Sequence, residues 1–195
     1  MIRFYLNREL AEGLGYRLSR WKRWSRDFLP PDPLGGLQSG FARQYHLSEA
    51  FQVYLGGHLV ADLKFSVAEA QIILKDLSSW ISNHYFPNTT SNGIETSPAN
   101  ADTYRIHIFL SPEAGHREPD RRYAVRKQMA FKADGQRGAW IVSEQYMEKW
   151  LEKGECLDLP AEARQGMHWM NSRTLYISEL YRTFSQKLER IPLRP

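Results

Sequence analysis

The hydrophobic and polar positions at the start of the chain follow a helical period that glycine and proline interrupt. The pattern predicts a first helix over residues 8–14, with Asn7 as its N-cap and Gly15 just past its end. A second helix is expected over residues 20–28, after a Ser19 cap. It should stop before the two prolines that follow, because proline lacks the backbone N–H that a helix needs.

A loop and two more helices are expected next. Residues 32–40 are rich in proline and glycine, which is typical of a protruding loop or hairpin tip, and residues 41–45 could return from it as a short strand. A third helix is predicted from Ser48 to about residue 59. Ser66 is the expected cap of a fourth helix, whose apolar residues recur at steps of three and four.

In the second half of the chain, the apolar residues first follow the alternating pattern of strands instead of helical spacing. Residues 104–110 alternate like a half-buried strand, and 122–131 and 139–142 are further strand candidates. Asp134-Gly135 between the latter two is a good hairpin turn. A helix is expected from Ser143 to about residue 151. A last helix, over about 171–190, has an apolar stripe that must be buried, formed by Ile177, Leu180, Tyr181, Phe184, Leu188 and Ile191.

These elements define an α+β chain in three parts. Residues 1–82 would form the first domain. Residues 83–102 contain mostly loop-forming side chains, so we interpret them as a linker. Residues 103–195 would form a small α+β region that ends in the long helix.

The overall composition and net charge exclude only a few functional classes of protein. The 195 residues carry a formal net charge of +4, too small an excess to indicate a nucleic-acid partner by itself. No apolar run approaches membrane-spanning length and no signal peptide is evident, so we expect a cytoplasmic protein with no membrane association. Cys156 is the one cysteine, which excludes a disulfide framework.

The expected second helix carries the strongest local signal. Tryptophans lie among a dense group of cations, and Trp21, Trp24 and Phe28 recur at core spacing, which would leave the cations outside. Such a patch binds DNA by neutralising phosphates, although a solvated basic helix face is a common alternative. A short helix, a glycine turn and a basic second helix predict a helix-turn-helix, which places its second helix in the major groove. The cations are Arg17, Arg20, Lys22, Arg23 and Arg26.

The order of several segments resembles the MerR family of winged helix-turn-helix regulators. The resemblance covers about the first 80 residues, and Lys64 stands where the family usually has glycine. The matching segments are Tyr5-Leu6-Asn7-Arg8-Glu9-Leu10-Ala11, Trp21-Lys22-Arg23-Trp24, Phe28-Leu29-Pro30-Pro31, Gly40-Phe41-Ala42-Arg43-Gln44-Tyr45, Leu47-Ser48-Glu49-Ala50 and Lys64-Phe65-Ser66-Val67-Ala68-Glu69-Ala70.

The resemblance implies a transcriptional regulator that binds double-stranded DNA as a homodimer. It assigns DNA contact to Arg17, Arg20, Lys22 and Arg23 and to Arg43 beside the wing, and we add Arg26 from the same cationic patch. Our hypothesis is that Arg20 and Arg23 reach bases and the others reach phosphates. The last helix is the candidate dimerisation element; packing on its own β-region is the equal alternative.

The sequence gives weaker support to other functional classes. His107, His116, Glu118, Asp120 and Glu144 include acids and bases, but no catalytic motif links them, so we expect no enzyme. No metal-ligand set surrounds Cys156, and we expect no cofactor. The aromatic residues of 103–195 leave a small-molecule effector pocket open as an alternative. A protein-interaction module on a winged scaffold is another.

Overall fold

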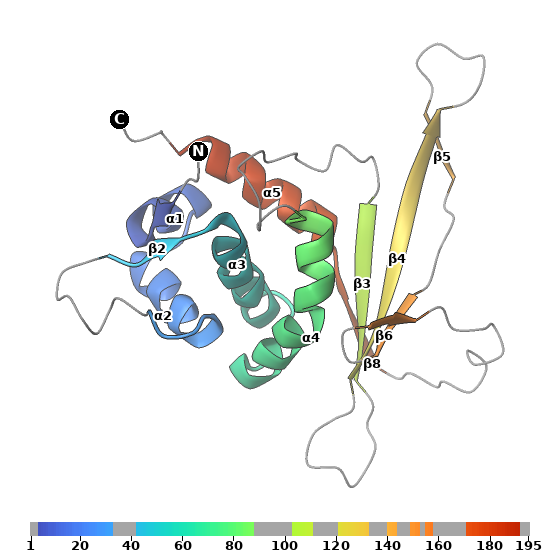
Figure 1. The fold of residues 1–195 in the computed structure, drawn as a ribbon, viewed down its shortest axis with the longest axis horizontal. Coiled ribbons are helices and arrows are strands. Elements are labelled where there is room, and N and C mark those ends of the chain that lie inside the picture. Colours follow the sequence, from blue (N-terminus) through green and yellow to red (C-terminus); the bar gives the residue numbers. More distant parts are fainter. Residues whose placement is uncertain are drawn as a thin grey trace, which may run out of the picture. The chain divides into compact units, whose positions relative to one another are not determined.

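The computed structural model combines helices and strands in an α+β arrangement (Figure 1). It describes residues 4–32, 42–87, 103–110, 121–132, 140–143, 149–152, 155–157 and 171–191. The chain divides into two compact units, one formed by residues 1–98 with 180–195 and the other by residues 99–179.

The first unit contains helices and a two-stranded ribbon. In the ribbon, Tyr5 pairs with Tyr45 and Leu6 with Gln44, antiparallel. Within the described residues, the elements that contribute to this unit are β1 (Tyr5–Leu6), α1 (Asn7–Leu14), α2 (Leu18–Phe28), β2 (Gln44–Tyr45), α3 (Leu47–Ala61), α4 (Val67–Tyr85) and α5 (Ile177–Glu189), which enters it from Leu180. The four N-terminal helices predicted from the sequence are thereby confirmed.

The turn between α1 and α2 depends on one glycine. Gly15 has φ +80°, a left-handed conformation that glycine adopts without steric cost. Its N–H donates to Glu12 O at 3.2 Å, and Tyr16 N–H donates to Ala11 O at 2.8 Å. This pair of bonds is a Schellman motif, which satisfies the last carbonyls of α1 and lets α2 begin three residues later.

Ser66 caps α4 as predicted, with its hydroxyl accepting from Glu69 N–H at 3.2 Å. The other three predicted caps are wrong by one or two residues. Helices α1, α2 and α3 begin at Asn7, Leu18 and Leu47, so Asn7, Ser19 and Ser48 lie inside them. In α1 and α3, a glutamate in the first turn caps the helix instead. Glu9 accepts from Leu6 N–H, and Glu49 accepts from His46 N–H, so each bonds the backbone of the N-cap residue three positions earlier.

Helices α2 and α3 approach closely because α3 contains two adjacent glycines. A Cβ atom at Gly56 would lie 2.5 Å from the Phe28 ring, and one at Gly57 would lie 2.4 Å from the Trp24 ring. Both rings are buried in the core, as the sequence predicted. The missing side chains therefore create the space that α2 occupies.

Helix α5 packs on the first unit. Its Tyr181 ring lies 5.1 Å from Phe51 and 4.6 Å from Tyr85, and its Phe184 ring lies 5.3 Å from Tyr54. Figure 1 shows α5 running beside α3. Lys187 Nζ also donates to Leu14 O at 3.1 Å.

The expected alternative, packing on its own β-region, holds only for the first turn of α5, where Ser178 Oγ accepts from Tyr104 N–H at 2.8 Å. The residues of α5 from Leu180 belong with the N-terminal helices, so the expected 103–195 region ends earlier in the structure. Phe184, Leu188 and Ile191 are buried within the chain, and the stripe does not offer a free dimerisation face. The sequence could show that the stripe must be buried but not which distant rings would cover it.

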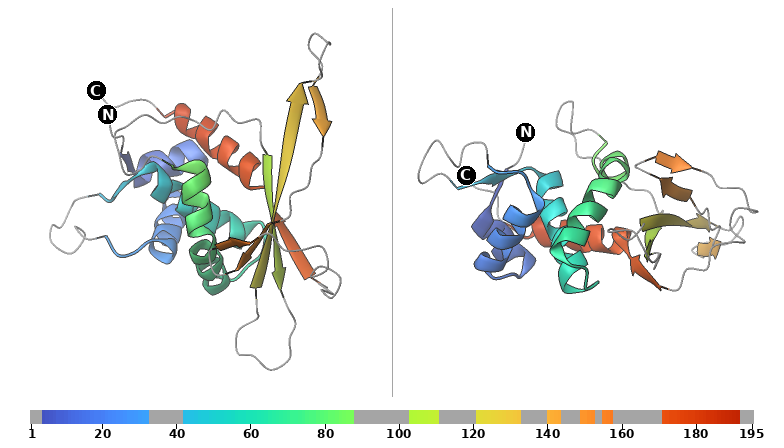
Figure 2. Two further views of the ribbon diagram at one scale, coloured as in Figure 1. Left: turned by 45° about the vertical axis from the view of Figure 1, so that its right-hand side comes forward. Right: turned by 90° about the horizontal axis from the view of Figure 1, so that it is seen from below.

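The second unit is an antiparallel sheet. Its strand order is β7-β6-β4-β3-β8, and β5 pairs with the far end of β4, beyond the part that β3 covers (Figure 2). The strands are β3 (Thr103–Leu110), β4 (Arg121–Lys132), β5 (Trp140–Ser143), β6 (Lys149–Glu152), β7 (Glu155–Leu157) and β8 (Asn171–Leu175). The predicted strands β3, β4 and β5 are confirmed, while the turn at Asp134-Gly135 lies outside the described residues.

Two helix predictions in this unit are wrong in part. Residues 149–152 form a strand because they pair with β4, although Lys, Leu and Glu favour a helix locally. Residues 171–175 form β8 on the free edge of β3, so the last helix begins only at Ile177. Long-range strand pairing overrode the local preference in both places.

Among the helices that the structure describes, none is long and apolar enough to cross a membrane.

Candidate nucleic-acid interface

The five predicted cations of α2 are all exposed, and we call the surface that carries them the outer face of α2: Arg17, Arg20, Lys22, Arg23 and Arg26. Arg17 is the N-cap residue, and the other four lie within the helix. At 3.6 residues per turn, these four spread over roughly 160° of the helix circumference. The structure therefore brings the predicted group together.

The side chains of these cations form few interactions within the protein. The Arg23 Nε atom lies 3.8 Å from Asp27 Oδ2, a loose pair in which Arg23 is 73% exposed. Arg20 Cζ lies 5.9 Å from the centre of a Trp24 ring. Within the described part of the chain, the side chains of Arg17, Lys22 and Arg26 form no hydrogen bond or ion pair.

The opposite side of α2 is fixed in the core. Trp21 is fully buried, while Trp24 and Phe28 fill the gap left by the α3 glycines. Tyr16 from the preceding turn meets the Trp24 ring edge-on at 5.0 Å. The cations are consequently presented by a helix whose rotation about its own axis is set by three large rings.

Side chains from two other helices satisfy carbonyl groups at the C-terminal end of α2. Gln52 Nε2 in α3 donates to Phe28 O at 2.8 Å, and Gln71 Nε2 in α4 donates to Asp27 O at 2.6 Å. A helix end leaves such carbonyls without intrahelical partners. These bonds tie the end of α2 to both neighbouring helices.

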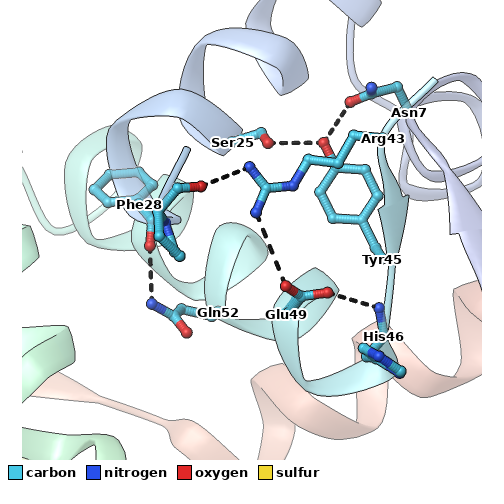
Figure 3. Close-up of polar contacts among 9 residues, drawn as sticks. Asn7, Ser25, Phe28, Arg43, Tyr45, His46, Glu49 and Gln52 are labelled. Carbon is cyan, nitrogen blue, oxygen red and sulfur yellow. Dashed lines mark hydrogen bonds and ion pairs between the residues drawn. The ribbon is translucent and has the colours of Figure 1, made fainter. Parts of the chain in front are cut away.

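Arg43 lies differently from the cations of α2. Its side chain is only 14% exposed; Nη1 donates to Pro30 O at 2.8 Å, and Nη2 lies 3.8 Å from Glu49 Oε1. Figure 3 shows the guanidinium group beside Glu49 and near the Tyr45 ring. Arg43 thus joins the two chain segments that flank residues 33–41, and its guanidinium is occupied inside the protein.

Tyr45 forms the second connection in this region. Its hydroxyl donates to Asn7 Oδ1 at 2.6 Å and lies 2.7 Å from Ser25 Oγ (Figure 3). The Tyr45 ring is fully buried, and Ser25 is buried within α2. One phenol therefore joins the start of α1, the middle of α2 and the strand β2.

Burial affects the ionisation of a tyrosine beside this interface. Desolvation, with Tyr54 and Asp62 nearby, raises the pKa of Tyr16 to about 12. Desolvation likewise raises the pKa values of Tyr45 and Tyr54. These phenols belong to the support of α2, and they remain protonated at neutral pH.

Sequence reasoning missed the supporting residues Ser25, Tyr45, Glu49 and Gln52. The only signal was Ser25 itself, a polar residue one position after Trp24 on the expected apolar side of its helix. The loop expected over 32–40 lies, apart from Asp32, outside the described residues. Among the described residues, no group of three His, Cys, Asp or Glu side chains could hold a metal ion.

No protein-family model matches this chain, and no curated protein matches it with significance.

Proposed function

We propose that the first unit is a winged helix-turn-helix that binds double-stranded DNA, and that α2 is its recognition helix. The observation that carries this proposal is the outer face of α2: five exposed cations on a helix whose other side is buried and whose carbonyl end is bonded to α3 and α4. A rigid cationic helix is suited to the major groove, because little order must be gained on binding.

The first turn of α2 supports the same function. It contains no acidic residue, and no side chain caps it. The N–H groups of a helix start favour phosphate oxygens, and Arg17 and Arg20 add charge at that end. Phosphate contacts would position the helix, and base contacts by Arg20 and Arg23 would supply sequence preference.

The backbone at Lys64 supports the resemblance to MerR-type regulators. This residue has φ +60°, the left-handed conformation that favours glycine, and it occupies the position where that family usually has glycine. The β1–β2 ribbon also joins the N-terminus to the segment that follows residues 33–41, where a wing would lie.

The proposed site residues are the five cations of α2. Arg43 is assigned a supporting role instead, because its guanidinium is bonded to Pro30 and Glu49. We keep a homodimer in the proposal only because of the MerR resemblance. The surface through which two copies pair would lie outside the buried apolar stripe of α5.

Capture of random genomic duplex fragments on the purified full chain, at low and at moderate salt, tests this function. Sequencing of the retained fragments should show one enriched motif, and a near-palindromic motif would indicate a dimer. Arg20→Ala with Arg23→Ala should abolish the enrichment. Retention that does not depend on salt, or an equal motif with the double variant, would show that α2 is not the recognition helix.

A further inference from the structure

Helix α2 contains one acidic residue among its cations, Asp27. At 3.6 residues per turn, Asp27 lies about 40° from Arg23 and about 20° from Arg20 around the helix axis, so it belongs to the outer face. Its side chain is 27% exposed, and its Oδ2 atom lies 3.8 Å from Arg23 Nε. Within the described part of the chain, Arg23 is the one cation of the outer face that forms an ion pair.

The carboxylate of Asp27 is poorly placed to stabilise the helix. The last turn of a helix carries partial negative charge, so an acidic side chain in that turn is unfavourable. Arg23 precedes Asp27 by four residues, which is the less favourable order for an ion pair within a helix. Solvent weakens the pair further, because the Arg23 side chain is 73% exposed. The pair therefore contributes little to the free energy of unfolding.

The same carboxylate is also poorly placed for contact with phosphates. A negative charge beside the cations repels the phosphate backbone and lowers the affinity that those cations provide. A helix that made only phosphate contacts would bind DNA more tightly without it. The position of Asp27 is therefore explained neither by helix stability nor by phosphate binding.

The geometry of the ion pair suits recognition of a base. Asp27 meets Arg23 at Nε, and a guanidinium group held at Nε keeps its two terminal NH₂ groups for another partner. Two parallel N–H donors match O6 and N7 of guanine, and no other base offers two neighbouring acceptors in the major groove. Asp27 is itself held in place, because Gln71 Nε2 in α4 donates to Asp27 O at 2.6 Å.

We propose that Arg23 binds a guanine base in duplex DNA and that Asp27 is its positioning residue. The carboxylate holds the flexible guanidinium group in the orientation that a guanine edge accepts, and it disfavours contact of that group with phosphates. This role of Arg23 rests on the function proposed for α2 and adds the base that the helix recognises.

Fluorescence anisotropy of the full chain tests the proposal on two short labelled duplexes. One contains the motif enriched by genomic capture, and the other is a scrambled sequence of the same composition. Each guanine of the motif is replaced in turn by deazaguanine, an analogue without the N7 acceptor. At the guanine that Arg23 contacts, this replacement should weaken binding of the unaltered chain about fivefold.

Two variants separate the roles of the pair. Arg23→Lys keeps the charge but loses the paired donors, so it should remove the deazaguanine effect and leave the slope of log K against log salt unchanged. Asp27→Asn should reduce the deazaguanine effect to less than about twofold and tighten binding to the scrambled duplex about twofold, because a repulsive charge is lost. The melting temperature of Asp27→Asn should not fall, since the acid is unfavourable at the helix end.

A double variant and a control complete the experiment. In the Arg23→Lys background, Asp27→Asn should leave the response to deazaguanine unchanged, because a positioning residue acts only through the group that it positions. Glu189→Gln removes one negative charge from an exposed position on α5. This control should change binding to both duplexes by the same factor, below about twofold.

The outcomes distinguish this proposal from the function proposed for α2. Absence of binding to any duplex overturns both. Duplex binding without an enriched motif, or a motif in which no deazaguanine has an effect, overturns only the assignment of guanine to Arg23. The positioning role is overturned if Asp27→Asn weakens binding to both duplexes by the same factor, as loss of a purely structural contact would, or changes neither.

Discussion

The hydroxyl of Tyr45 donates a 2.6 Å hydrogen bond to the side-chain oxygen of Asn7, 38 residues earlier in the chain. The same hydroxyl lies 2.7 Å from Ser25 Oγ, so it also reaches the helix that carries the cations. This contact makes the position of α2 depend on the strand that follows residues 33–41.

Tyr45→Phe should lower the free energy of unfolding by about 1–2 kcal/mol, because the buried Ser25 hydroxyl loses a partner while the ring still fills its space. Urea denaturation measures this. Tyr176→Phe, at a half-exposed position, is the matched control and should change stability by less than about 0.5 kcal/mol. An unchanged urea midpoint for Tyr45→Phe would contradict the structural role of the hydroxyl.

Gly57→Ala should destabilise the protein by about 1–3 kcal/mol, because the added methyl group would meet the Trp24 ring. The direction is informative, since alanine normally stabilises a helix relative to glycine by about 1 kcal/mol. Thermal unfolding provides the measurement, with Ser79→Ala on the exposed side of α4 as the control. A higher melting temperature for Gly57→Ala would show that α2 and α3 are not in close contact at this position.

Lys64→Gly should stabilise the protein by about 0.5–1 kcal/mol, since glycine relieves the left-handed backbone at φ +60°. The gain is limited because glycine also makes the unfolded chain more flexible. Lys75→Gly, the same change within α4, should cost about 1 kcal/mol in the same denaturation experiment. Equal losses at both positions would be inconsistent with the backbone conformation at Lys64.

Stability should fall at alkaline pH through Tyr16. Its pKa is about 12 in the folded protein and about 10.0 for an unperturbed tyrosine, so below pH 10 both states keep the proton. Between pH 10 and 12 the unfolded chain releases it first, and the free energy of unfolding decreases as pH rises. Melting temperatures from pH 9 to about 12 should therefore fall less steeply for Tyr16→Phe, which cannot ionise. Identical curves for the two proteins would contradict this.

The parts of the fold that local chemistry determines could be predicted. Gly15 ends α1, Ser66 caps α4, and Trp21, Trp24 and Phe28 lie in the core as their spacing indicates. The cations of α2 could be found for the same reason, because a buried face at helical spacing implies where the other side chains point.

The contacts that depend on distant segments could not be predicted. Residues 171–175 form a strand only because β3 offers a free edge, and α5 is buried by rings such as Phe51 that lie more than a hundred positions away. Arg43 was assigned a DNA contact because it lies just beyond the expected hairpin tip, in the segment that resembles the MerR wing. Its partners Pro30 and Glu49 became apparent only in three dimensions.

The central claim is that the outer face of α2 binds duplex DNA, and the salt dependence of binding tests it most directly. Lys22→Gln with Arg26→Gln should weaken duplex binding for all sequences alike and reduce the slope of log K against log salt by about 1.8, because about 0.9 is expected per phosphate contact. Lys75→Gln with Arg182→Gln, the same charge change elsewhere on the first unit, should leave the slope unchanged. If both pairs of substitutions reduce the slope equally, or neither does, the interface is not on α2.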